Sequence, residues 1–472
     1  MNKILLVNPH ETTHGGGLTT PPLGLLYIAG TLLNHRFDVQ LIDGCLQGKE
    51  SIRSRITTWR PDIVGITCLT PGRKKALEVA QMTKNVDPNI RVIMGGVHPT
   101  IMYRQILEHY PFVDFVVLGE GEQTCLELAE GKKPFEINGL AYRAEGKVLT
   151  TASRTGVPNL DELPFPAWNL VDLRKYPAAG NGVIGGIDLA KEPRASIIFS
   201  RGCTGSCNFC SSWWIWREWR HRSPRNMADE IEVLYRTYGM RYFSFEDDTM
   251  TVDRVATLEL CDEIVSRELK IVFELTTRVD CVDEAILGKL KEAGCYKIAL
   301  GIETGSNVLL EKMGKKTDTA TAERAIQLVK RAGISVTALL IVGNVGETSE
   351  TVSETVQFLR RTRPDELGSV GGLWILPGTM LYQACKRRGF IDDDFWLHDE
   401  PYKTYTLDFS PEQLAEFERR IYRYDDGWVE WVLARVRPQL RRMRRLLSRQ
   451  DCRISRSPET RTSSAKSLSS RT

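Results

Sequence analysis

The chain has 472 residues, of which 42% are hydrophobic and 26% charged, and 63 Lys and Arg nearly balance 60 Asp and Glu. This ordinary composition excludes collagen-like, mucin-like and wholly disordered proteins. At roughly 150 residues per domain, the length predicts two or three domains, each with its own core. Positive charge gathers at the end, where residues 435–472 hold 12 Lys and Arg against 2 Asp and Glu. We therefore expect a basic, disordered tail over residues 441–472.

Apolar runs in this sequence are short. The longest mostly apolar runs, residues 112–118 and 336–342, are far shorter than the roughly 20 residues that cross a bilayer. The first residues contain four consecutive apolar side chains before polar residues and proline, too few for a signal peptide. We expect a cytoplasmic protein without a membrane span, whose 11 cysteines stay reduced. An odd cysteine count there favours metal or catalytic use of any closely spaced set.

The first third of the sequence alternates short β-rich runs with helical patterns. Strands are expected at residues 3–8, 39–42, 63–67, 91–94 and 115–117. Helical patterns lie between them at residues 24–34, 48–59, 73–85 and 100–109. This alternation predicts a doubly wound parallel α/β domain, flavodoxin-like or Rossmann-like, over residues 1–130. Residues 131–190 lose the alternation and gather proline and glycine, which predicts a linker.

The β-α alternation returns after residue 190. Strands are expected at residues 196–199, 242–245, 271–275, 297–301, 335–342 and 368–375. Such a series of βα units predicts a partial (β/α)6 barrel of the TIM type over residues 191–380, with its site at the carboxyl ends of the strands. Residues 381–440 are expected to form a small, mostly helical C-terminal cap over the barrel mouth.

Three closely spaced cysteines follow the first strand of this second series. Residues 201–210 read RGCTGSCNFC, which spaces Cys203, Cys207 and Cys210 as C-x3-C-x2-C. Thiolates on one loop can converge on a soft metal centre, and iron–sulfur clusters are held by such ligands, usually four. Three ligands leave one iron open for chemistry. The alternatives are a structural zinc loop or buried structural cysteines, but zinc sites normally present cysteine pairs and the nearest histidine, His221, has no matching partner.

This loop resembles that of the radical S-adenosylmethionine (SAM) superfamily, in which an aromatic residue precedes the last cysteine, as Phe209 does here. In that family the cysteines bind a [4Fe-4S] cluster and SAM binds the open iron. One electron from the cluster then cleaves SAM to methionine and a 5′-deoxyadenosyl radical. The resemblance implies catalytic and metal-binding roles for Cys203, Cys207 and Cys210, and the family's fold is the partial barrel expected above.

Further segments resemble the family's SAM-binding motifs at later strand ends. They are residues 245–249 (FEDDT), 300–306 (LGIETGS) and 342–348 (VGNVGET). Because SAM is a zwitterion, its ammonium and carboxylate groups need partners of opposite charge. The residues assigned to SAM by this resemblance are Phe209, Glu246, Asp247, Arg278, Glu303, Gly343 and Gly346. For Glu303, a structural ion pair at the barrel rim is the alternative.

In the N-terminal domain, glycine-rich turns follow the strands at the edge of the sheet where doubly wound domains bind ligands. Joined to a radical SAM barrel, this domain resembles the cobalamin-binding domain of class B radical SAM enzymes. The residues assigned to cobalamin are Pro22, Leu23, Gly24, Thr67, Leu69, Gly95, Gly96, His98, Gly119 and Glu120. The family's D-x-H-x-x-G signature has Cys45 in place of its cobalt-binding histidine, so histidine ligation is not expected. A structural or regulatory domain without a ligand is the alternative.

The combined resemblance implies a cobalamin-dependent radical SAM enzyme with a [4Fe-4S] cluster, SAM and cobalamin as cofactors. Methyl transfer to an unactivated centre of a small-molecule or natural-product-type substrate is the principal hypothesis. Radical oxidative cyclisation or rearrangement without methyl transfer, as in the anaerobic porphyrin cyclase, is the alternative among enzymes. An iron–sulfur electron carrier or a corrinoid-binding regulator is the alternative outside them. A reductant such as flavodoxin or ferredoxin is implied as a partner, and nucleic acid is not expected.

Overall fold

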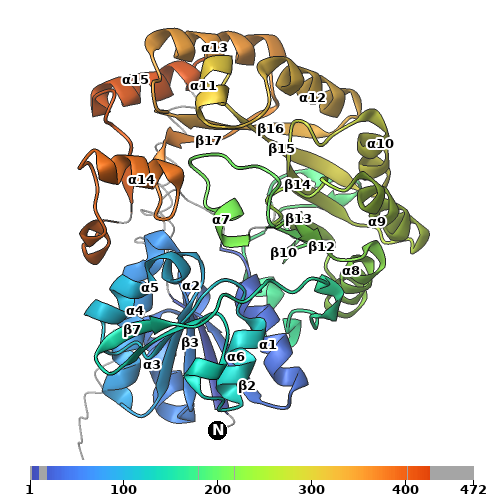
Figure 1. The fold of residues 1–472 in the computed structure, drawn as a ribbon. Helices are drawn as coiled ribbons and strands as arrows, with labels where there is room; N and C mark the ends of the chain where they lie inside the picture. The colour runs from blue at the N-terminus through green and yellow to red at the C-terminus, as the bar shows by residue number, and fades with distance from the viewer. Residues whose placement is uncertain (1–2, 10–18, 179, 217, 401, 426–472) are drawn as a thin grey trace, which may run out of the picture. The chain divides into compact units, whose positions relative to one another are not determined.

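Two largely parallel sheets, one in each half of the chain, form the framework of the molecule (Figure 1). The structure is a computed structural model that describes residues 3–9, 19–178, 180–216, 218–400 and 402–425. Residues up to Tyr424 form one compact unit. The predicted tail and the end of the predicted cap lie outside the described residues. Within the described part of the chain, no helix combines the length and apolar character that crossing a bilayer requires.

The N-terminal sheet contains five parallel strands in the order β2-β1-β3-β4-β5, which is the flavodoxin-like order. These strands are β1 (Lys3–Asn8), β2 (Asp38–Asp43), β3 (Ile63–Thr67), β4 (Arg91–Gly95) and β5 (Phe115–Val117). The helices are α1 (Leu23–Asn34), α2 (Gly44–Gln47), α3 (Lys49–Trp59), α4 (Arg73–Val86), α5 (Val97–His109) and α6 (Glu122–Ala129). The predicted doubly wound domain is confirmed.

Two features explain how this sheet forms and where it ends. Residues 4–7 of β1 are all buried, because β1 lies inside a parallel sheet that helices cover on both faces. An antiparallel hairpin, β6 (Leu140–Ala144) and β7 (Lys147–Thr150), extends the sheet beyond β5. Part of the stretch predicted as a linker therefore completes the N-terminal sheet.

The second sheet has six parallel strands in sequence order, with helices along its outer side (Figure 1). The strands are β10 (Arg194–Ile197), β13 (Tyr242–Phe245), β14 (Val272–Arg278), β15 (Cys295–Glu303), β16 (Ser335–Val342) and β17 (Glu366–Gly372). The helices are α7 (Ser212–Trp216), α8 (Pro224–Tyr238), α9 (Arg254–Ser266), α10 (Glu284–Glu292), α11 (Asn307–Lys312), α12 (Thr319–Arg331) and α13 (Ser349–Thr362). This is the predicted partial (β/α)6 barrel.

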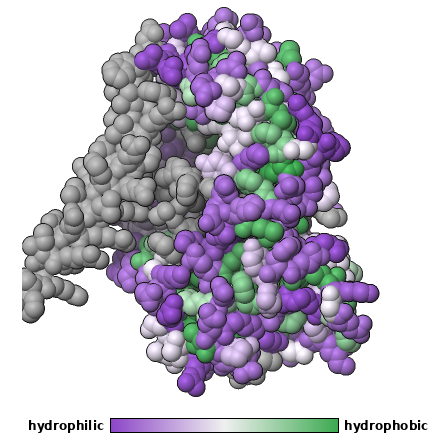
Figure 2. All heavy atoms as spheres, turned by 90° about the vertical axis from the view of Figure 1, so that its left-hand side faces the viewer, coloured by the Kyte–Doolittle hydropathy of each residue, from purple (hydrophilic) through white to green (hydrophobic). Residues whose placement is uncertain are grey.

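Short elements complete the chain. The small strands are β8 (Val183–Ile184), β9 (Ile187–Asp188), β11 (Ser200–Arg201), β12 (Arg220–His221), β18 (Trp374–Ile375) and β19 (Lys403–Thr404). The last described helices are α14 (Met380–Arg387) and α15 (Pro411–Tyr422), and α15 packs against α13 and β17. Where the structure describes it, the face shown in Figure 2 is mostly hydrophilic with apolar side chains scattered among the polar ones, as expected where side chains meet water.

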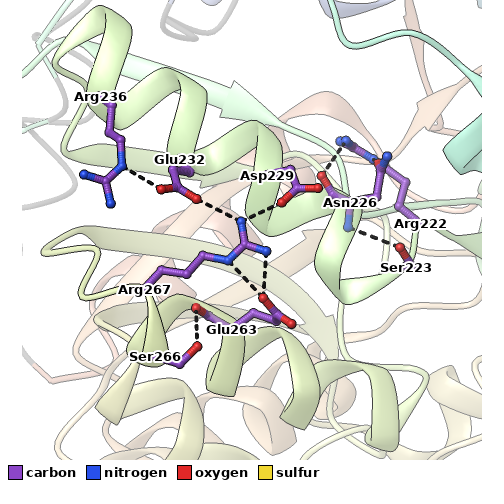
Figure 3. Close-up of polar contacts among 9 residues, drawn as sticks. All are labelled: Arg222, Ser223, Asn226, Asp229, Glu232, Arg236, Glu263, Ser266 and Arg267. Carbon is purple, nitrogen blue, oxygen red and sulfur yellow. Dashed lines mark hydrogen bonds and ion pairs between the residues drawn. The ribbon is translucent and has the colours of Figure 1, made fainter.

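An ion-pair network on the outside of the barrel joins α8 to the end of α9 (Figure 3). The guanidinium of Arg267 lies 2.7 Å from Asp229, 3.0 Å from Glu232 and 2.7 Å from Glu263. The Arg267 side chain is 17% exposed, and its carboxylate partners are more exposed. Because exposed pairs are screened by water, each contributes about 0–1 kcal/mol.

Candidate functional site

The three motif cysteines lie on a loop whose two ends are paired with each other. β11 and β12 are antiparallel, so segment 202–219, called the cysteine loop below, leaves and re-enters the barrel at one place. Gly202 begins the loop with φ of 94°, and a Cβ there would lie 2.4 Å from the carbonyl oxygen of Glu218. Glycine is therefore required at this turn.

The thiols of the cysteine loop gather around its backbone. A Cβ on Gly205 would lie 3.4 Å from Cys203 Sγ and 3.8 Å from Cys207 Sγ, so both sulfurs flank this glycine. Backbone amides donate to two of the sulfurs, Gly205 N to Cys203 Sγ at 3.3 Å and Ser212 N to Cys210 Sγ at 3.4 Å. Amide donors stabilise thiolates and tune iron–sulfur clusters. This donor set fits a cluster held by three cysteines.

Burial disfavours the thiolate form of two of the three cysteines when no metal centre is bound. Burial raises the pKa of Cys210 to about 11, and burial also raises the pKa of Cys207, where Lys315 opposes the rise. Binding of metal would therefore release protons. Among the described residues, no three His, Cys, Asp or Glu side chains converge on a single metal-ion position. A four-iron cluster does not need such convergence, because its cysteines bind different iron atoms.

Contacts with α11 and α14 fix the far side of the cysteine loop. Asn208 N donates to the carbonyl of Met313 at 2.9 Å, and Asn208 Nδ2 donates to that of Lys312 at 2.8 Å. Asn208 O accepts from Leu381 N at 3.0 Å. Phe209, the aromatic residue of the motif, is half-buried and packs against the hydrophobic core.

Two ion pairs, Arg278–Asp280 and Lys315–Glu303, lie beside the cysteine loop. A Cβ on Gly205 would lie 3.0 Å from Nη1 of Arg278, whose other nitrogens bind both carboxylate oxygens of Asp280 at 2.8 and 2.7 Å. Lys315 Nζ lies 2.5 Å from Glu303 Oε1, and both side chains are buried. Glu303 has φ of 64°, a strained conformation for a non-glycine residue that is often found at functional sites. The sequence reasoning predicted Arg278 and Glu303 but missed Lys315.

The two acidic residues after β13 face different surroundings. Asp247 is buried and accepts from Phe199 N at 3.1 Å and from Ser200 Oγ at 2.5 Å, so it anchors the chain that leads into the cysteine loop. Burial raises the pKa of Asp247 to about 7. Glu246 keeps 37% of its side chain exposed and accepts from Ser196 Oγ at 2.9 Å. Of the two, Glu246 is available to a ligand.

Glu246 opens into a cavity of about 280 Å³ to which all six barrel strands contribute. Its charged side chains are Arg194, Glu246, Asp247, Glu274, Lys297 and Glu366. Glu274 pairs with Arg194 at 2.6 Å and with Lys297 at 2.9 Å. The interior of the partial barrel is thus polar, whereas closed TIM barrels fill theirs with branched apolar residues.

The glycines of the fifth-strand motif permit close packing. A Cβ on Gly343 would lie 2.8 Å from Leu414, and one on Gly346 would lie 2.4 Å from Lys312 Nζ. Glu347 is buried and accepts from the backbone amides of Gly343 and Asn344. Burial raises the pKa of Glu347 to about 7 even though these amides favour its charged form.

The substitution Glu347→Gln is expected to stabilise the protein in mild alkali. The unfolded chain ionises this carboxyl near 4.5 and the folded chain near 7, so the folded protein binds more protons between these values and loses stability as the pH rises through them. The gain in unfolding free energy from the substitution should grow by roughly 2 kcal/mol between about pH 5.5 and pH 8 in urea denaturation. Glu354→Gln, on the exposed side of α13, serves as the control. Parallel pH profiles for parent and Glu347→Gln would contradict the prediction.

The residues assigned to cobalamin meet at the carboxyl edge of the N-terminal sheet. Those near the ends of β3, β4 and β5 and at the start of α1 are Pro22, Leu23, Gly24, Thr67, Leu69, Gly95, Gly96 and Gly119. Cys68 N donates to Gly95 O at 2.9 Å, which joins the loops after β3 and β4. Among the described residues, apart from chain neighbours and nearby helix backbone, no atom lies within 4 Å of a Cβ placed on Gly24 or Gly119, and Leu69 is 55% exposed. Open backbone beside an apolar surface fits a large, flat ligand.

His98 lies in a closed position, and Cys45 is half-buried. His98 is 2% exposed, its ring lies 5.9 Å from that of Trp396, and its Nδ1 has no hydrogen-bond partner among the residues that the structure describes. Burial lowers the pKa of His98 to about 3, so the ring is neutral. Cys45 follows Asp43, whose carboxylate caps α2 and accepts from Tyr176 at 2.8 Å. The signature aspartate therefore has a structural role at this position.

The predicted cap contacts both halves of the chain. Arg73 of α4 is 1% exposed and donates to the carbonyls of Trp396, His398 and Glu400 at 2.8, 2.7 and 2.5 Å. These contacts bury His98 beneath Trp396. Glu120 also lies in a closed position, because ion pairs with the barrel enclose it.

Comparisons with known proteins agree with this geometry. Residues 16–129 match the B12 binding domain model, and residues 197–359 match the Radical SAM superfamily model. The chain is 35% identical over 381 residues to the anaerobic magnesium-protoporphyrin IX monomethyl ester cyclase of Rubrivivax gelatinosus, covering 77% of this chain and 66% of the cyclase. It is 31% identical over 437 residues to an uncharacterized methyltransferase of Pyrococcus horikoshii, covering 89% of this chain and 91% of that relative.

The fold is similar to that of the radical S-adenosylmethionine methyltransferase TsrM from Kitasatospora setae, which was solved with cobalamin and a [4Fe-4S] cluster bound. The TM-score is 0.68 at 21% identity, over 82% of this chain and 75% of that chain. The predicted cofactors are confirmed at the level of the family, since the radical SAM domain implies a [4Fe-4S] cluster and SAM, and the other domain implies cobalamin. Because both domains occur in this order and one relative matches over nearly its whole length, the chain belongs to the cobalamin-binding radical SAM enzymes.

Proposed function

We propose that this enzyme transfers a methyl group to an unreactive centre of a small, polar substrate held inside the barrel. The observation that carries the proposal is the polar cavity of about 280 Å³ to which all six strands contribute. Binding sites for drug-sized ligands measure about 300–1,000 Å³ and are mostly apolar. A porphyrin macrocycle is large and apolar, so it matches neither the size nor the charge of this cavity.

Residues at the carboxyl ends of the barrel strands would divide the work of cofactor binding. Cys203, Cys207 and Cys210 would hold the [4Fe-4S] cluster, which supplies the electron that cleaves bound SAM. Arg278 and Lys315 lie beside the thiols, where the SAM carboxylate needs a cation, and each is paired here with a carboxylate that the ligand would have to replace, Asp280 and Glu303. Glu246 offers an exposed carboxylate for an ammonium group.

The charges of the cavity indicate what kind of substrate it accepts. Arg194 and Lys297 are engaged by Glu274. Glu366 keeps 54% of its side chain exposed, accepts a 3.1 Å bond from Thr337 and lies 3.7 Å from Lys297. Exposed carboxylates select hydroxyl and amine donors. The proposed substrate is therefore a small molecule rich in hydrogen-bond donors.

Radical cyclisation or oxidation without methyl transfer is the second candidate, because the porphyrin cyclase is 35% identical. The chain spans 66% of that cyclase but 91% of the methyltransferase relative, which favours methyl transfer.

Methyl-labelled SAM distinguishes the two candidates. Enzyme reconstituted without air, reduced by flavodoxin and supplied with cobalamin, CD3-labelled SAM and a metabolite extract should form 5′-deoxyadenosine and S-adenosylhomocysteine together. Mass spectrometry should find a polar metabolite that has gained CD3 in place of hydrogen. Formation of 5′-deoxyadenosine with neither S-adenosylhomocysteine nor a labelled metabolite would favour cyclisation or oxidation. Omitting cobalamin provides the control, and it should remove the labelled metabolite.

A further inference from the structure

Two arginines at the ends of the cysteine loop bind two glutamates of the N-terminal domain. Arg201 on β11 lies 3.1 Å from Glu120 and 2.6 Å from Glu122. Arg220 on β12 binds the other carboxylate oxygen of Glu120. These four residues are called the Arg/Glu cluster below. The cluster pairs two cations with two anions, so its net charge is zero.

Water has little access to the Arg/Glu cluster. The side chains of Arg201, Arg220, Glu120 and Glu122 are 7%, 10%, 7% and 6% exposed. The Arg201 guanidinium also lies 5.0 Å from the ring of Tyr27 on α1. Burying four charges carries a large desolvation cost, so such a cluster is weak evidence for added stability. Its better-attested use is to specify one arrangement of the parts that it joins.

The residues of the Arg/Glu cluster lie next to the cysteine loop on one side and next to residues assigned to cobalamin on the other. Arg201 stands two residues before Cys203, and Arg220 lies where the cysteine loop returns to the barrel. Glu120 stands beside Gly119, one of the residues assigned to cobalamin at the carboxyl edge of the N-terminal sheet, called the cobalamin edge below, and Glu122 is the first residue of α6. The two ends of the cysteine loop therefore cannot move away from Glu120 and Glu122 without breaking these ion pairs.

We propose that the Arg/Glu cluster holds the cysteine loop against the cobalamin edge and so couples the binding of the iron–sulfur cluster to the binding of cobalamin. Its members are positioning residues that act through the loop. The inference rests on the cofactors of the proposed function. It goes beyond that function by naming the residues through which the binding of one cofactor affects the binding of the other. Coupling between two binding sites is reciprocal, so it can be measured from either side.

A thermodynamic cycle tests this coupling without a substrate. The Kd of hydroxocobalamin is measured without air for the full chain with and without its reconstituted iron–sulfur cluster. In the parent, the iron–sulfur cluster should tighten cobalamin binding by a factor on the order of 10. In the double variant Arg201→Met, Glu122→Leu the factor should fall to about 1. This variant removes one cation and one anion, so Glu120 and Arg220 remain as a balanced pair.

The control and a milder variant make every outcome informative. Arg267→Met is the control, because it breaks the ion-pair network of Figure 3, in which three carboxylates surround Arg267 on the outside of the barrel. In this variant the iron–sulfur cluster should tighten cobalamin binding by the same factor as in the parent. If the double variant does not fold, Arg201→Lys keeps the charge but cannot hold both glutamates with one ammonium, and it should lose most of the coupling. Parental coupling in a folded Arg201 variant, or a factor of about 1 in the parent, would overturn the inference. A parent that binds neither cofactor would instead overturn the proposed function.

Discussion

Replacing any one of Cys203, Cys207 and Cys210 by alanine should abolish the iron–sulfur cluster and reduce 5′-deoxyadenosine formation to background. The reason is that one loop carries all three proposed thiolate ligands and its turns are set by Gly202 and by amide bonds to the sulfurs. A loop with two thiolates cannot complete the set of a site-open cluster. Iron and sulfide analysis of protein purified without air, EPR of the reduced protein and chromatography of the SAM products measure the result.

Cys281 provides a stringent control for this experiment. It is half-buried on the turn after β14, where its thiol contacts Asp280 at 3.8 Å, but it lies outside the C-x3-C-x2-C motif. Cys281→Ala should keep the iron content, the EPR signal and its change on addition of SAM. Retention of the cluster in Cys207→Ala, or its loss in Cys281→Ala, would show that the ligand set is not the one proposed.

Arg222→Met should lower the free energy of unfolding by about 3–5 kcal/mol. The Glu230 side chain is fully buried, binds Arg222 and accepts from Trp168 Nε1 at 3.0 Å. Without Arg222 its charge would stay buried with no countercharge. At roughly 2–4 °C per kcal/mol for a domain of this size, the melting temperature should fall by on the order of 10 °C. Thermal denaturation followed by circular dichroism measures the shift.

Two further variants show how much of the stability lost in Arg222→Met comes from the buried charge and how much from lost packing. Arg222→Met with Glu230→Leu should recover about half of the lost stability, because an apolar pair can replace a buried ion pair although Trp168 then lacks its acceptor. Arg267→Met, in the more exposed network of Figure 3, should cost less than about 1 kcal/mol. Equal losses for Arg222→Met and Arg267→Met would contradict the argument from burial.

Most of the framework could be predicted from local sequence patterns. The bounds expected for the strands at residues 3–8, 63–67, 242–245 and 335–342 agree with β1, β3, β13 and β16. The hairpin β6–β7 was not predicted, because three of the four residues of β7 are exposed and the surrounding prolines and glycines indicate a loop. The edge strand β7 is defined by its pairing with β6, which in turn pairs with β5, and no local pattern records these partners.

The candidate site also combines features that local sequence predicts with features that only distant contacts determine. The spacing of Cys203, Cys207 and Cys210 is local, so it is visible in the sequence, and the glycine-rich strand ends predict which edge of each sheet carries the site. Glu246 and Asp247 are neighbours whose different surroundings depend on Ser196 and Ser200, in another strand region. Lys315 gave no signal of its own, because a lysine after a short helix usually faces water. A buried carboxylate, Glu303, brings it beside the cysteine loop.

The amino-acid sequence by itself determined the order of the two domains, the β-α alternation and the cysteine motif, because these depend on neighbours along the chain. The tertiary structure alone decided which charges face a ligand and which face each other. Glu120 is bound by Arg201 and Arg220, and His98 is covered by Trp396, all from distant parts of the chain. Burial and ion pairing depend on what folding brings together, and the sequence around one residue does not specify its partner across the molecule.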